Sequence, residues 1–392
     1  MKILLVNDYS APVGGAEIQM LGLRRVLREK GHDVRLFSST AVAGDSDEQC
    51  FGTTSSFRTL LQTANPWAAG RLRKVLRSFQ PDVVHVTLFL TQLSPLILPL
   101  LREFPSVYYA VWYRAVCPIG TKMLPDGSVC EVRAGWVCCR NGCLPLRDWI
   151  PLSFQKHLLD RNLRVFRRIT SNSEAVRARM IKEGISPVEV IAPGVSVQPQ
   201  RPPLTSPRVV AFSGRLVREK GADLLMTAFA KVRQAMPESR LLIAGDGPER
   251  ENLKKLAASL GISNSVEMAG HLSRENMETF LERAWVRVVP SRWPEPFGLS
   301  AVEAMMRGTA VVASNLGGLT EIVRHERTGL LIDPEVPPLS GALLKLLQDS
   351  KLAEEMGAAG RIVALEHFTE EAFAAKFLRV YQEIIAEIQR RP

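Results

Sequence analysis

Short apolar runs alternate with stretches of helical periodicity along almost the whole chain, and this pattern restricts the fold more than any other feature. In the first half, the runs expected to be strands are 2–6, 34–37, 81–86, 106–111, 168–171 and 188–191. In the second half they are 209–212, 241–244, 265–268, 286–289, 310–313 and 330–332. Such runs, separated by amphipathic helices, are typical of parallel sheets with crossover helices. The sequence therefore predicts an α/β protein with two doubly wound, Rossmann-like domains.

The boundary between the domains is expected where this pattern breaks. From Pro193 to Pro207 the chain is rich in proline and has no apolar periodicity, as in a linker. The 392 residues suffice for two domains that each bury a core. We expect an N-terminal domain over 1–195, a C-terminal domain over 207–369 and a long closing helix within 370–392, whose apolar residues recur at helical spacing.

The first half carries most of the positive charge. Residues 1–200 contain 25 Lys and Arg against 16 Asp and Glu, whereas residues 201–392 contain 25 against 24. The densest basic runs are Arg71, Arg73, Lys74 and Arg77, and Arg161, Arg164, Arg167 and Arg168. These runs are either solvated helix faces or amphipathic faces for an anionic membrane or a phosphorylated acceptor. No zinc-finger, RNA-binding or helix-turn-helix signature accompanies them, so no nucleic-acid partner is expected.

No transmembrane segment is expected. The longest apolar stretch, 86–101, is interrupted by polar residues and prolines and is shorter than a spanning helix requires. The opening run 1–6 is too short for the core of a signal peptide. We therefore expect a cytoplasmic protein, with peripheral contact at the inner membrane face as one interpretation of its charge.

Two glycine-containing loops follow strands of the second domain. The first contains Gly214, Arg215 and Lys220 and leads into a helix. Cations, close backbone approach at glycine and a helix amino terminus suit a diphosphate, although surface cations before a helix are also common in purely structural loops. The second loop, 245–248, either lines a nucleotide or is an ordinary tight turn that starts a helix.

The most specific feature is a pair of carboxylates, Glu295 and Glu303, separated by seven residues after the strand at 286–289. Glu295 is expected in a loop and Glu303 about one turn inside the following helix, so both can face one crevice. The amides of Phe297, Gly298 and Leu299 then lie at the helix start, where they have no intrahelical acceptor. Carboxylates accept hydrogen bonds from hydroxyl pairs, which a nucleotide sugar offers on its ribose and on its hexose.

Together these motifs resemble family 4 of the retaining glycosyltransferases, which have the GT-B fold. The resemblance spans nearly all of the second domain and rests on the following residues: Gly214, Arg215, Glu219, Lys220, Gly221, Gly245, Pro248, Glu295–Leu299, Glu303, Ala304, Gly317, Gly318 and Glu321. The first domain agrees more loosely, through Gly14–Glu17, Pro81–His85 and Ser171–Glu174.

The resemblance implies two domains that face each other across a cleft and a final helix that returns to the first domain. It implies that Arg215 and Lys220 clamp the diphosphate of a nucleotide-sugar donor, Glu295 holds hydroxyls of the transferred sugar and Glu303 holds the ribose. Gly15 would let the backbone approach the phosphates.

The implied activity is metal-independent transfer of a hexosyl unit, with retention of configuration, to a glycan, lipid-linked or polysaccharide acceptor. This is the chemistry of polysaccharide and cell-envelope biosynthesis. No cofactor is required for the transfer.

The chain departs from the family at one point in the first domain. Many relatives carry a His-Asp pair just before an aromatic residue and Cys-Pro, whereas here Val111 and Trp112 occupy these positions. Either Trp112 stacks on an acceptor sugar, or the protein binds its donor with little turnover. His85, at the end of an expected strand, is either a structural histidine or an acceptor contact.

Five of the six cysteines lie in an expected insertion over 114–150: Cys117, Cys130, Cys138, Cys139 and Cys143. Their clustering suggests a structural zinc or iron–sulfur staple, with Cys130, Cys138 and Cys143 as candidate ligands. Their spacing is not that of a standard zinc ribbon, so buried thiols and a disulfide stay open as alternatives.

Other functions are less consistent with the sequence. An oxidoreductase would need Gly-x-Gly-x-x-Gly after the first strand, where the chain instead has Asn7, Asp8 and Tyr9. A nucleotide-sugar epimerase of the same fold explains the Glu295–Glu303 loop less well. A noncatalytic nucleotide-sugar-binding protein is the alternative that is not an enzyme.

Overall fold

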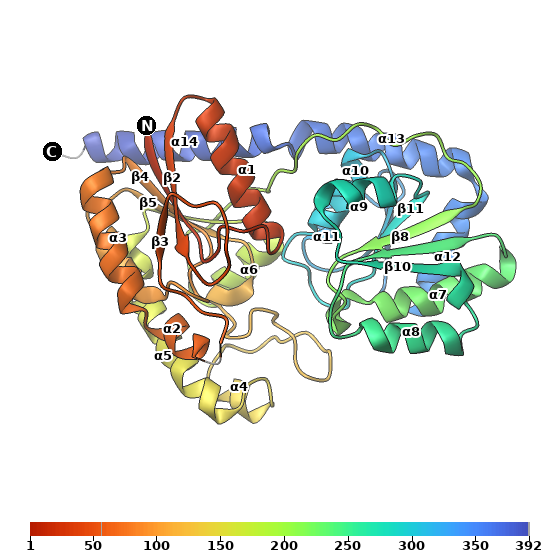
Figure 1. Ribbon diagram of the computed structural model, residues 1–392, viewed down its shortest axis with the longest axis horizontal. Helices are drawn as coiled ribbons and strands as arrows, with labels where there is room; N and C mark the ends of the chain where they lie inside the picture. Colours follow the sequence, from red (N-terminus) through yellow and green to blue (C-terminus); the bar gives the residue numbers. More distant parts are fainter. Residues whose placement is uncertain (56, 391–392) are drawn as a thin grey trace. The chain divides into compact units, whose positions relative to one another are not determined.

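The chain forms two compact units, and the computed structural model describes residues 1–55 and 57–390. Unit 1 comprises Met1–Ser196 together with Thr369–Pro392, and unit 2 comprises Val197–Phe368. Each unit is a parallel β-sheet covered by helices (Figure 1). The predicted α/β class with two Rossmann-like sheets is confirmed.

The sheet of unit 1 has seven strands in the order β3-β2-β1-β4-β5-β6-β7, and all neighbouring pairs are parallel. The strands are β1 Lys2–Val6, β2 Asp33–Ser39, β3 Glu48–Cys50, β4 Val83–Val86, β5 Ser106–Ala110, β6 Arg168–Ser171 and β7 Glu189–Val190. β1 is an interior strand between β2 and β4 and is buried beyond its first residue, which agrees with its uninterrupted apolar sequence.

The helices of unit 1 connect these strands and cover both faces of the sheet. The α-helices are α1 Gly15–Glu29, α2 Arg58–Thr63, α3 Pro66–Phe79, α4 Trp136–Arg140, α5 Leu146–Asn162, α6 Glu174–Lys182 and α14 Glu370–Gln389. Short 3-10 helices are η1 Pro95–Leu101, η2 Tyr113–Ala115 and η3 Leu163–Val165. Side chains of Asn65, Ser173 and Thr369 cap α3, α6 and α14.

The last helix, α14, packs in the core of unit 1 against segments that lie far from it in the sequence. Phe373, Phe377 and Tyr381 are buried against the sheet and α1. Burying each of these side chains contributes about 1.5–3 kcal/mol. The start of α14 is fixed by an ion pair of 2.5 Å between Arg25 of α1 and the buried Glu370.

The sheet of unit 2 has six strands in the order β10-β9-β8-β11-β12-β13, again all parallel. They are β8 Val209–Ser213, β9 Arg240–Ala244, β10 Val266–Gly270, β11 Val286–Val289, β12 Ala310–Ser314 and β13 Gly329–Ile332. The connections are η4 Arg218–Lys220, α7 Ala222–Ala235, α8 Arg250–Ser259, η5 Ser263–Ser265, α9 Arg274–Leu281, α10 Leu299–Met306, α11 Leu319–Ile322, α12 Val336–Gln348 and α13 Ser350–His367.

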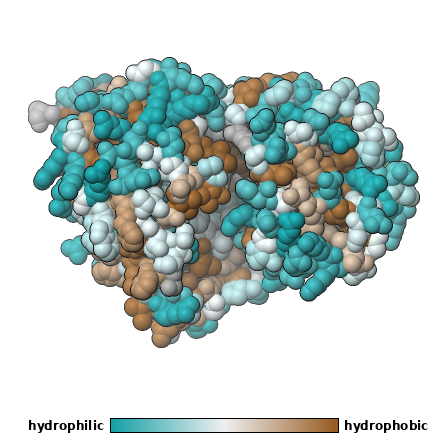
Figure 2. Space-filling model, in the orientation of Figure 1, coloured by the Kyte–Doolittle hydropathy of each residue, from teal (hydrophilic) through white to brown (hydrophobic). Residues whose placement is uncertain are grey.

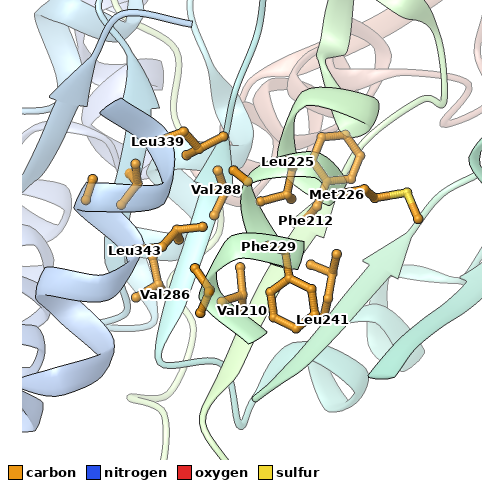
Figure 3. Close-up of a cluster of buried hydrophobic side chains, with 14 of the residues drawn as sticks. Val210, Phe212, Leu225, Met226, Phe229, Leu241, Val286, Val288, Leu339 and Leu343 are labelled. Atoms are coloured by element: carbon orange, nitrogen blue, oxygen red, sulfur yellow. The ribbon is translucent and has the colours of Figure 1, made fainter. Parts of the chain in front are cut away.

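The main core of unit 2 lies between the sheet and the helices α7 and α12. Side chains of β8 and β11, such as Val210 and Val288, point toward Phe229 of α7 and Leu339 and Leu343 of α12 (Figure 3). This packing fixes the positions of the strands, and therefore of the loops that begin at their ends.

Two details differ from the sequence expectations. The segment expected to be a linker packs on unit 2 from Val197 onward, where Arg201 N donates to Arg307 O at 2.8 Å and Arg201 Nε to Gly308 O at 3.0 Å. β3 was not predicted because its three residues include two polar ones and show no apolar run. Within residues 1–55 and 57–390, every helix lacks the combination of length and apolar character needed to span a bilayer.

His85 is a structural residue of unit 1. Its side chain on β4 is fully buried, with Nδ1 2.5 Å from the Tyr381 hydroxyl of α14 and the ring packed against Phe377. Burial lowers the pKa of His85 to about 3. The ring therefore stays neutral in the folded chain and helps to hold α14.

This burial predicts a pH dependence of stability. An unfolded histidine binds a proton below about pH 6.5, whereas folded His85 does so only near pH 3. The unfolded state thus binds more protons in this window, and His85 lowers the free energy of unfolding by about 1.4 kcal/mol for each pH unit below about 6.5. Urea unfolding measures the free energy of unfolding at pH 7 and at pH 5. The decrease between these two pH values should be smaller for His85→Leu than for the wild type, and equal decreases would contradict this account.

Candidate functional site

The loops that carry the predicted donor residues lie at one edge of the sheet in unit 2, because the carboxyl ends of parallel strands share an edge. Backbone hydrogen bonds join them. Gly214 N donates to Ala244 O at 3.0 Å, linking the loops after β8 and β9. Arg292 N donates to Glu219 O at 2.8 Å, and Gly318 N to Glu295 O at 2.8 Å. The four loops therefore form one connected layer.

Glycines allow the backbones of neighbouring loops in this layer to approach each other closely. Gly245 has φ +133°, and a Cβ atom there would lie 1.9 Å from the carbonyl oxygen of Gly214. Gly221 has φ +70°, and a Cβ atom there would lie 2.0 Å from the carbonyl oxygen of Pro290. Any side chain at either position would force the loops apart.

Two of the predicted residues meet directly. Lys220 Nζ lies 2.7 Å from Glu295 Oε1, and Ser291 Oγ donates to the same oxygen at 2.5 Å. The Glu295 side chain is 5% exposed and that of Lys220 is 24% exposed, so the pair is largely shielded from water. Lys220 Nζ also lies 5.5 Å from the ring centroid of Trp293. The cation is thus held over the loop by a carboxylate and an aromatic face.

Arg215 differs from Lys220. Its side chain is exposed near the start of the loop after β8 and, within the part of the chain that the structure describes, forms no ion pair. A guanidinium in this position remains available for an anion, to which it can donate two parallel hydrogen bonds.

The amino terminus of α10 supplies further donors. Gly298 is the N-cap, with φ +125° and no capping side chain, and Ala301 N donates back to Gly298 O at 3.0 Å. Among the described residues, the amides of Gly298 and Leu299 have no protein acceptor. These amides and the helix dipole favour an anion. The side chain of Phe297 is buried against Phe368, so only its backbone is suited to a ligand.

Arg287 is a residue that the sequence reasoning missed. It lies on β11 and is 3% exposed, and its Nη2 donates to Ser213 Oγ at 2.6 Å, directly before Gly214. Burial lowers the pKa of Arg287, and the nearby carboxylates of Glu303 and Glu278 oppose that shift. Arg287 thus places a positive charge between the β8 loop and the half-buried Glu303 of α10. A single arginine inside the run Val286–Val289 gave no signal beyond an interrupted strand.

Two further predicted site residues, Gly15 and Trp112, belong to unit 1. Gly15 is the first residue of α1. Trp112 is half-buried, and its ring lies against Gly120, where a Cβ atom would come within 2.9 Å of the indole. Their roles toward a donor and an acceptor stay predictions.

Asp8 organises the carboxyl edge of the unit 1 sheet. Its buried carboxylate accepts hydrogen bonds from the amides of Thr91, Gln92 and Leu93 and from the Thr91 hydroxyl, at 2.6–2.9 Å. Burial raises the pKa of Asp8. The loop after β4 is therefore built around Asp8, the second residue after β1, in the segment where a dinucleotide-binding protein would have its glycines.

The cysteine-rich insertion is attached to unit 1 through a buried ion pair of 2.9 Å between Lys122 and Glu183. All six cysteines are free thiols, and burial raises the pKa of Cys138 and Cys143. In residues 1–55 and 57–390, no three His, Cys, Asp or Glu side chains are placed to hold a metal ion. Cys130, Cys138 and Cys143 are therefore not brought together as a metal site in the described residues, and the zinc or iron–sulfur staple stays a prediction.

A separate hollow lies at the opposite edge of the unit 2 sheet. It is lined by Pro207, Arg240, Asn264 and Glu267, at the amino ends of β8, β9 and β10. It contains none of the predicted site residues.

Two family models match the chain. One described as glycosyltransferase family 4 matches residues 13–199, and one described as glycosyl transferases group 1 matches residues 197–363. Together they cover every predicted donor residue and every strand of the two sheets except β1.

Similar proteins carry related names. Glycogen synthase of Mycobacterium tuberculosis is 28% identical, over 97% of this chain and 94% of the relative. The GDP-mannose-dependent alpha-(1-6)-phosphatidylinositol monomannoside mannosyltransferase of the same organism is 36% identical, over 44% of this chain and 47% of the relative.

Solved structures show the same fold. Sucrose-phosphate synthase from Thermosynechococcus elongatus has a TM-score of 0.76 at 22% identity, covering 98% of this chain and 99% of that chain. HepE of Anabaena, in complex with UDP and glucose, has a TM-score of 0.69 at 20% identity, covering 98% of this chain and 100% of that chain. The shared architecture is the GT-B fold.

The tight contact between loops predicts that Gly245→Ala disturbs the layer. The new methyl group would overlap the Gly214 carbonyl, so we expect the free energy of unfolding of unit 2 to fall by about 1–3 kcal/mol. The matched control is Gly341→Ala in α12, where a Cβ atom meets nothing within 4 Å; this change should stabilise by about 0.5–1 kcal/mol. Chemical denaturation measures both, and equal effects would refute the close approach.

Proposed function

This chain belongs to family 4 of the glycosyltransferases, and we propose that it transfers a hexosyl unit from a nucleotide-diphosphate sugar with retention of configuration and without a metal ion. The observation that carries this proposal is the contact between Lys220 and Glu295. These residues come from loops 75 positions apart in the sequence and meet at 2.7 Å. They bring a cation for a diphosphate next to a carboxylate for sugar hydroxyls.

The diphosphate would bind to Arg215, Lys220 and the amides of α10. Arg215 is exposed and forms no ion pair within the described residues, and the amides of Gly298 and Leu299 have no acceptor there. Both groups would gain a partner when a diphosphate binds, at little cost in rearranging the protein. Lys220 would turn from Glu295 toward the phosphate or be shared by both, since its ammonium group has three protons to donate.

The two carboxylates would select the rest of the donor. We assign Glu303, one turn into α10, to the ribose hydroxyls and Glu295 to hydroxyls of the transferred sugar. The residues Lys220 and Ser291 hold Glu295 in place through one carboxylate oxygen, Oε1. Arg287 would position the β8 loop through its hydrogen bond to Ser213, and Glu303 through the attraction between their opposite charges.

The reaction proceeds by breaking the bond between the anomeric carbon and the diphosphate oxygen. The electron pair of that bond goes to the diphosphate, where the cations and the amides of α10 stabilise the growing charge. The acceptor hydroxyl attacks the anomeric carbon from the same face and forms the new glycosidic bond. Its proton passes to an oxygen of the leaving diphosphate, so no protein nucleophile is needed.

We propose a glycan, polysaccharide or lipid-linked sugar as acceptor, bound by unit 1, with Gly15 approaching the donor phosphates and Trp112 the acceptor. The names of two relatives support this range, since one is called a glycogen synthase and the other a phosphatidylinositol monomannoside mannosyltransferase. UDP and glucose in the Anabaena neighbour support a nucleotide-sugar donor.

A second candidate is a protein that binds its donor with little turnover. Val111 and Trp112 stand where many relatives have His-Asp, and the Trp112 ring is packed on Gly120. Binding of a nucleotide sugar with neither transfer nor hydrolysis, in a screen of donors and acceptors, would favour this candidate.

We predict that Arg215→Ala and Lys220→Ala each lower kcat by roughly 10²–10³, the scale of losing one preorganised group that stabilises charge in the transition state. The measurement is steady-state transfer with the donor that gives the largest thermal shift in a screen of nucleotide sugars. Near-normal turnover in both variants would refute the diphosphate clamp.

The matched control is Arg218→Ala, an exposed arginine in the same loop that stands outside the clamp. Its kcat should stay within about twofold of the wild type, because its side chain lies outside the proposed set of donor contacts. Lys220→Ala also leaves the buried Glu295 without its cation, at a cost of about 3–5 kcal/mol in the free energy of unfolding. Unfolding is therefore measured beside activity, and the rate comparison is made at a temperature at which both variants are folded.

Because two cations take the place of a divalent metal in this proposal, EDTA should leave the transfer rate largely intact. The measurement compares initial rates before and after extensive dialysis against the chelator. Complete loss of activity that magnesium or manganese restores would count against the mechanism.

A further inference from the structure

Large apolar side chains are exposed together on three helices of unit 1. They are each 52% to 69% exposed and are Phe57 and Leu60 at α2, Trp136 on α4, and Leu146, Ile150 and Phe154 on α5. We call this surface the α2–α4–α5 face. Figure 2 shows hydrophobic surface at the lower end of the view, where Figure 1 places these helices. The surfaces of soluble proteins rarely expose so many large apolar side chains together unless the patch binds a partner, a ligand or a membrane.

The three helices form one fixed surface. α2 and α5 pack together, and Thr63 Oγ1 donates to Pro151 O at 3.1 Å between them. α4 packs on the start of α5, where the rings of Trp136 and Trp149 lie 5.0 Å apart in a T-shaped arrangement and Trp149 Nε1 donates to Gly135 O at 2.9 Å. The exposed groups are therefore held in place by their own helices.

The outward side of α5 changes character along the helix. Leu146, Ile150 and Phe154 recur every four residues on the exposed side, whereas Leu152 and Leu159 fill the core on the other side. Farther along, the exposed side continues with Arg161 of α5 and with Arg164 just beyond its end. The outward surface thus passes from apolar residues in the first half of α5 to Arg161 and Arg164 around its end, with Asp160 paired to Lys156 between them, while the inner side of the helix is buried in the core.

The charge of the chain is concentrated in the segment that builds this face. Residues 51–168 contain sixteen Lys and Arg against six Asp and Glu, a net charge of +10, which equals the formal net charge of the whole chain. At the face, Arg58, Arg140, Arg161 and Arg164 form no ion pair within the part of the chain described here.

We propose that the α2–α4–α5 face docks on an anionic lipid bilayer. Tryptophan, phenylalanine, leucine and isoleucine would enter the headgroup and acyl boundary, and the arginines would remain at the level of the lipid phosphates. Each basic side chain near an anionic surface strengthens binding about fivefold. The inference goes beyond the proposed transfer reaction and would bring a lipid-linked acceptor within reach of the enzyme.

Two other occupants fit the face less well. A second copy of the chain that met it through the same surface would bring the unpaired arginines of both copies together, which is unfavourable. A nucleic acid would satisfy the arginines but would leave Leu146 and Ile150 facing its phosphates, since aliphatic side chains offer no stacking surface for bases.

The α3 helix, whose basic run was one of the two expected membrane contacts, does not have this combination. Its apolar residues Leu72, Val75 and Leu76 are buried in unit 1, and Arg71 pairs with Glu48 at 2.7 Å. Apart from Trp67 at its start, its outer side is charged and exposed. The structure therefore assigns the apolar part of the contact to α2, α4 and α5.

Flotation of the purified full-length chain with vesicles tests the proposal. One set of vesicles contains phosphatidylglycerol and phosphatidylcholine in equal parts, and the other contains phosphatidylcholine alone. We expect binding to the anionic vesicles that weakens at high salt, and little binding to the neutral ones. Ile150→Ser combined with Phe154→Ser should lower the partition coefficient by about tenfold or more, and Arg161→Glu combined with Arg164→Glu by about 25-fold or more.

Matched controls come from exposed side chains of unit 2. Ile362→Ser with Leu365→Ser removes two exposed apolar groups from α13, and Lys231→Glu with Lys255→Glu makes the same change of charge on α7 and α8. Both should bind vesicles like the wild type. The proposal is overturned if the wild type does not float, if the controls lose binding as strongly as the test variants, or if sedimentation shows self-association that the Ile150 and Phe154 changes abolish.

Discussion

A carboxylate taken out of water must be matched by a cation or by several donors, and in unit 2 this requirement connects the loops that carry the site. Glu295 is buried after β11, and its partners are Lys220 from the loop after β8 and Ser291 from its own loop. Neither loop could move alone without leaving that charge unpaired. The ion pair thus fixes the distance between the group assigned to the diphosphate and the group assigned to the sugar.

The same principle recurs elsewhere in the molecule with other partners. In unit 1, the buried carboxylate of Asp8 is held by four donors from the loop after β4, and Glu370 at the start of α14 is held by Arg25 of α1. Arg287 is the converse case, a buried cation beside Ser213 and near Glu303. In each case a buried charge joins segments far apart in the sequence, and the rigid base this provides allows exposed groups such as Arg215 to be positioned for a ligand.

The sequence predicted the strands well where both faces are buried, because a run such as 2–6 or 310–313 is apolar throughout. It also pointed to Lys220 and Glu295 separately, through motifs next to strand ends. It could not show that the two residues touch, since 75 residues separate them, nor that His85 bonds Tyr381 across 296 residues. β3 was missed because three residues show no period. The outward side of α5 was missed because the segment Leu146–Phe154 has apolar residues on both sides of the helix, and only the fold decides which side is covered.

The account depends most on where the diphosphate binds, and a crystal structure with a nucleotide-diphosphate sugar would test this directly. It should show the diphosphate within hydrogen-bond distance of Arg215, Lys220 and the amides of Gly298 and Leu299, with the sugar beside Glu295 and the ribose beside Glu303. A donor bound with its diphosphate away from the carboxyl ends of β8 and β11, for example in the hollow at the amino ends of β8–β10, would contradict it.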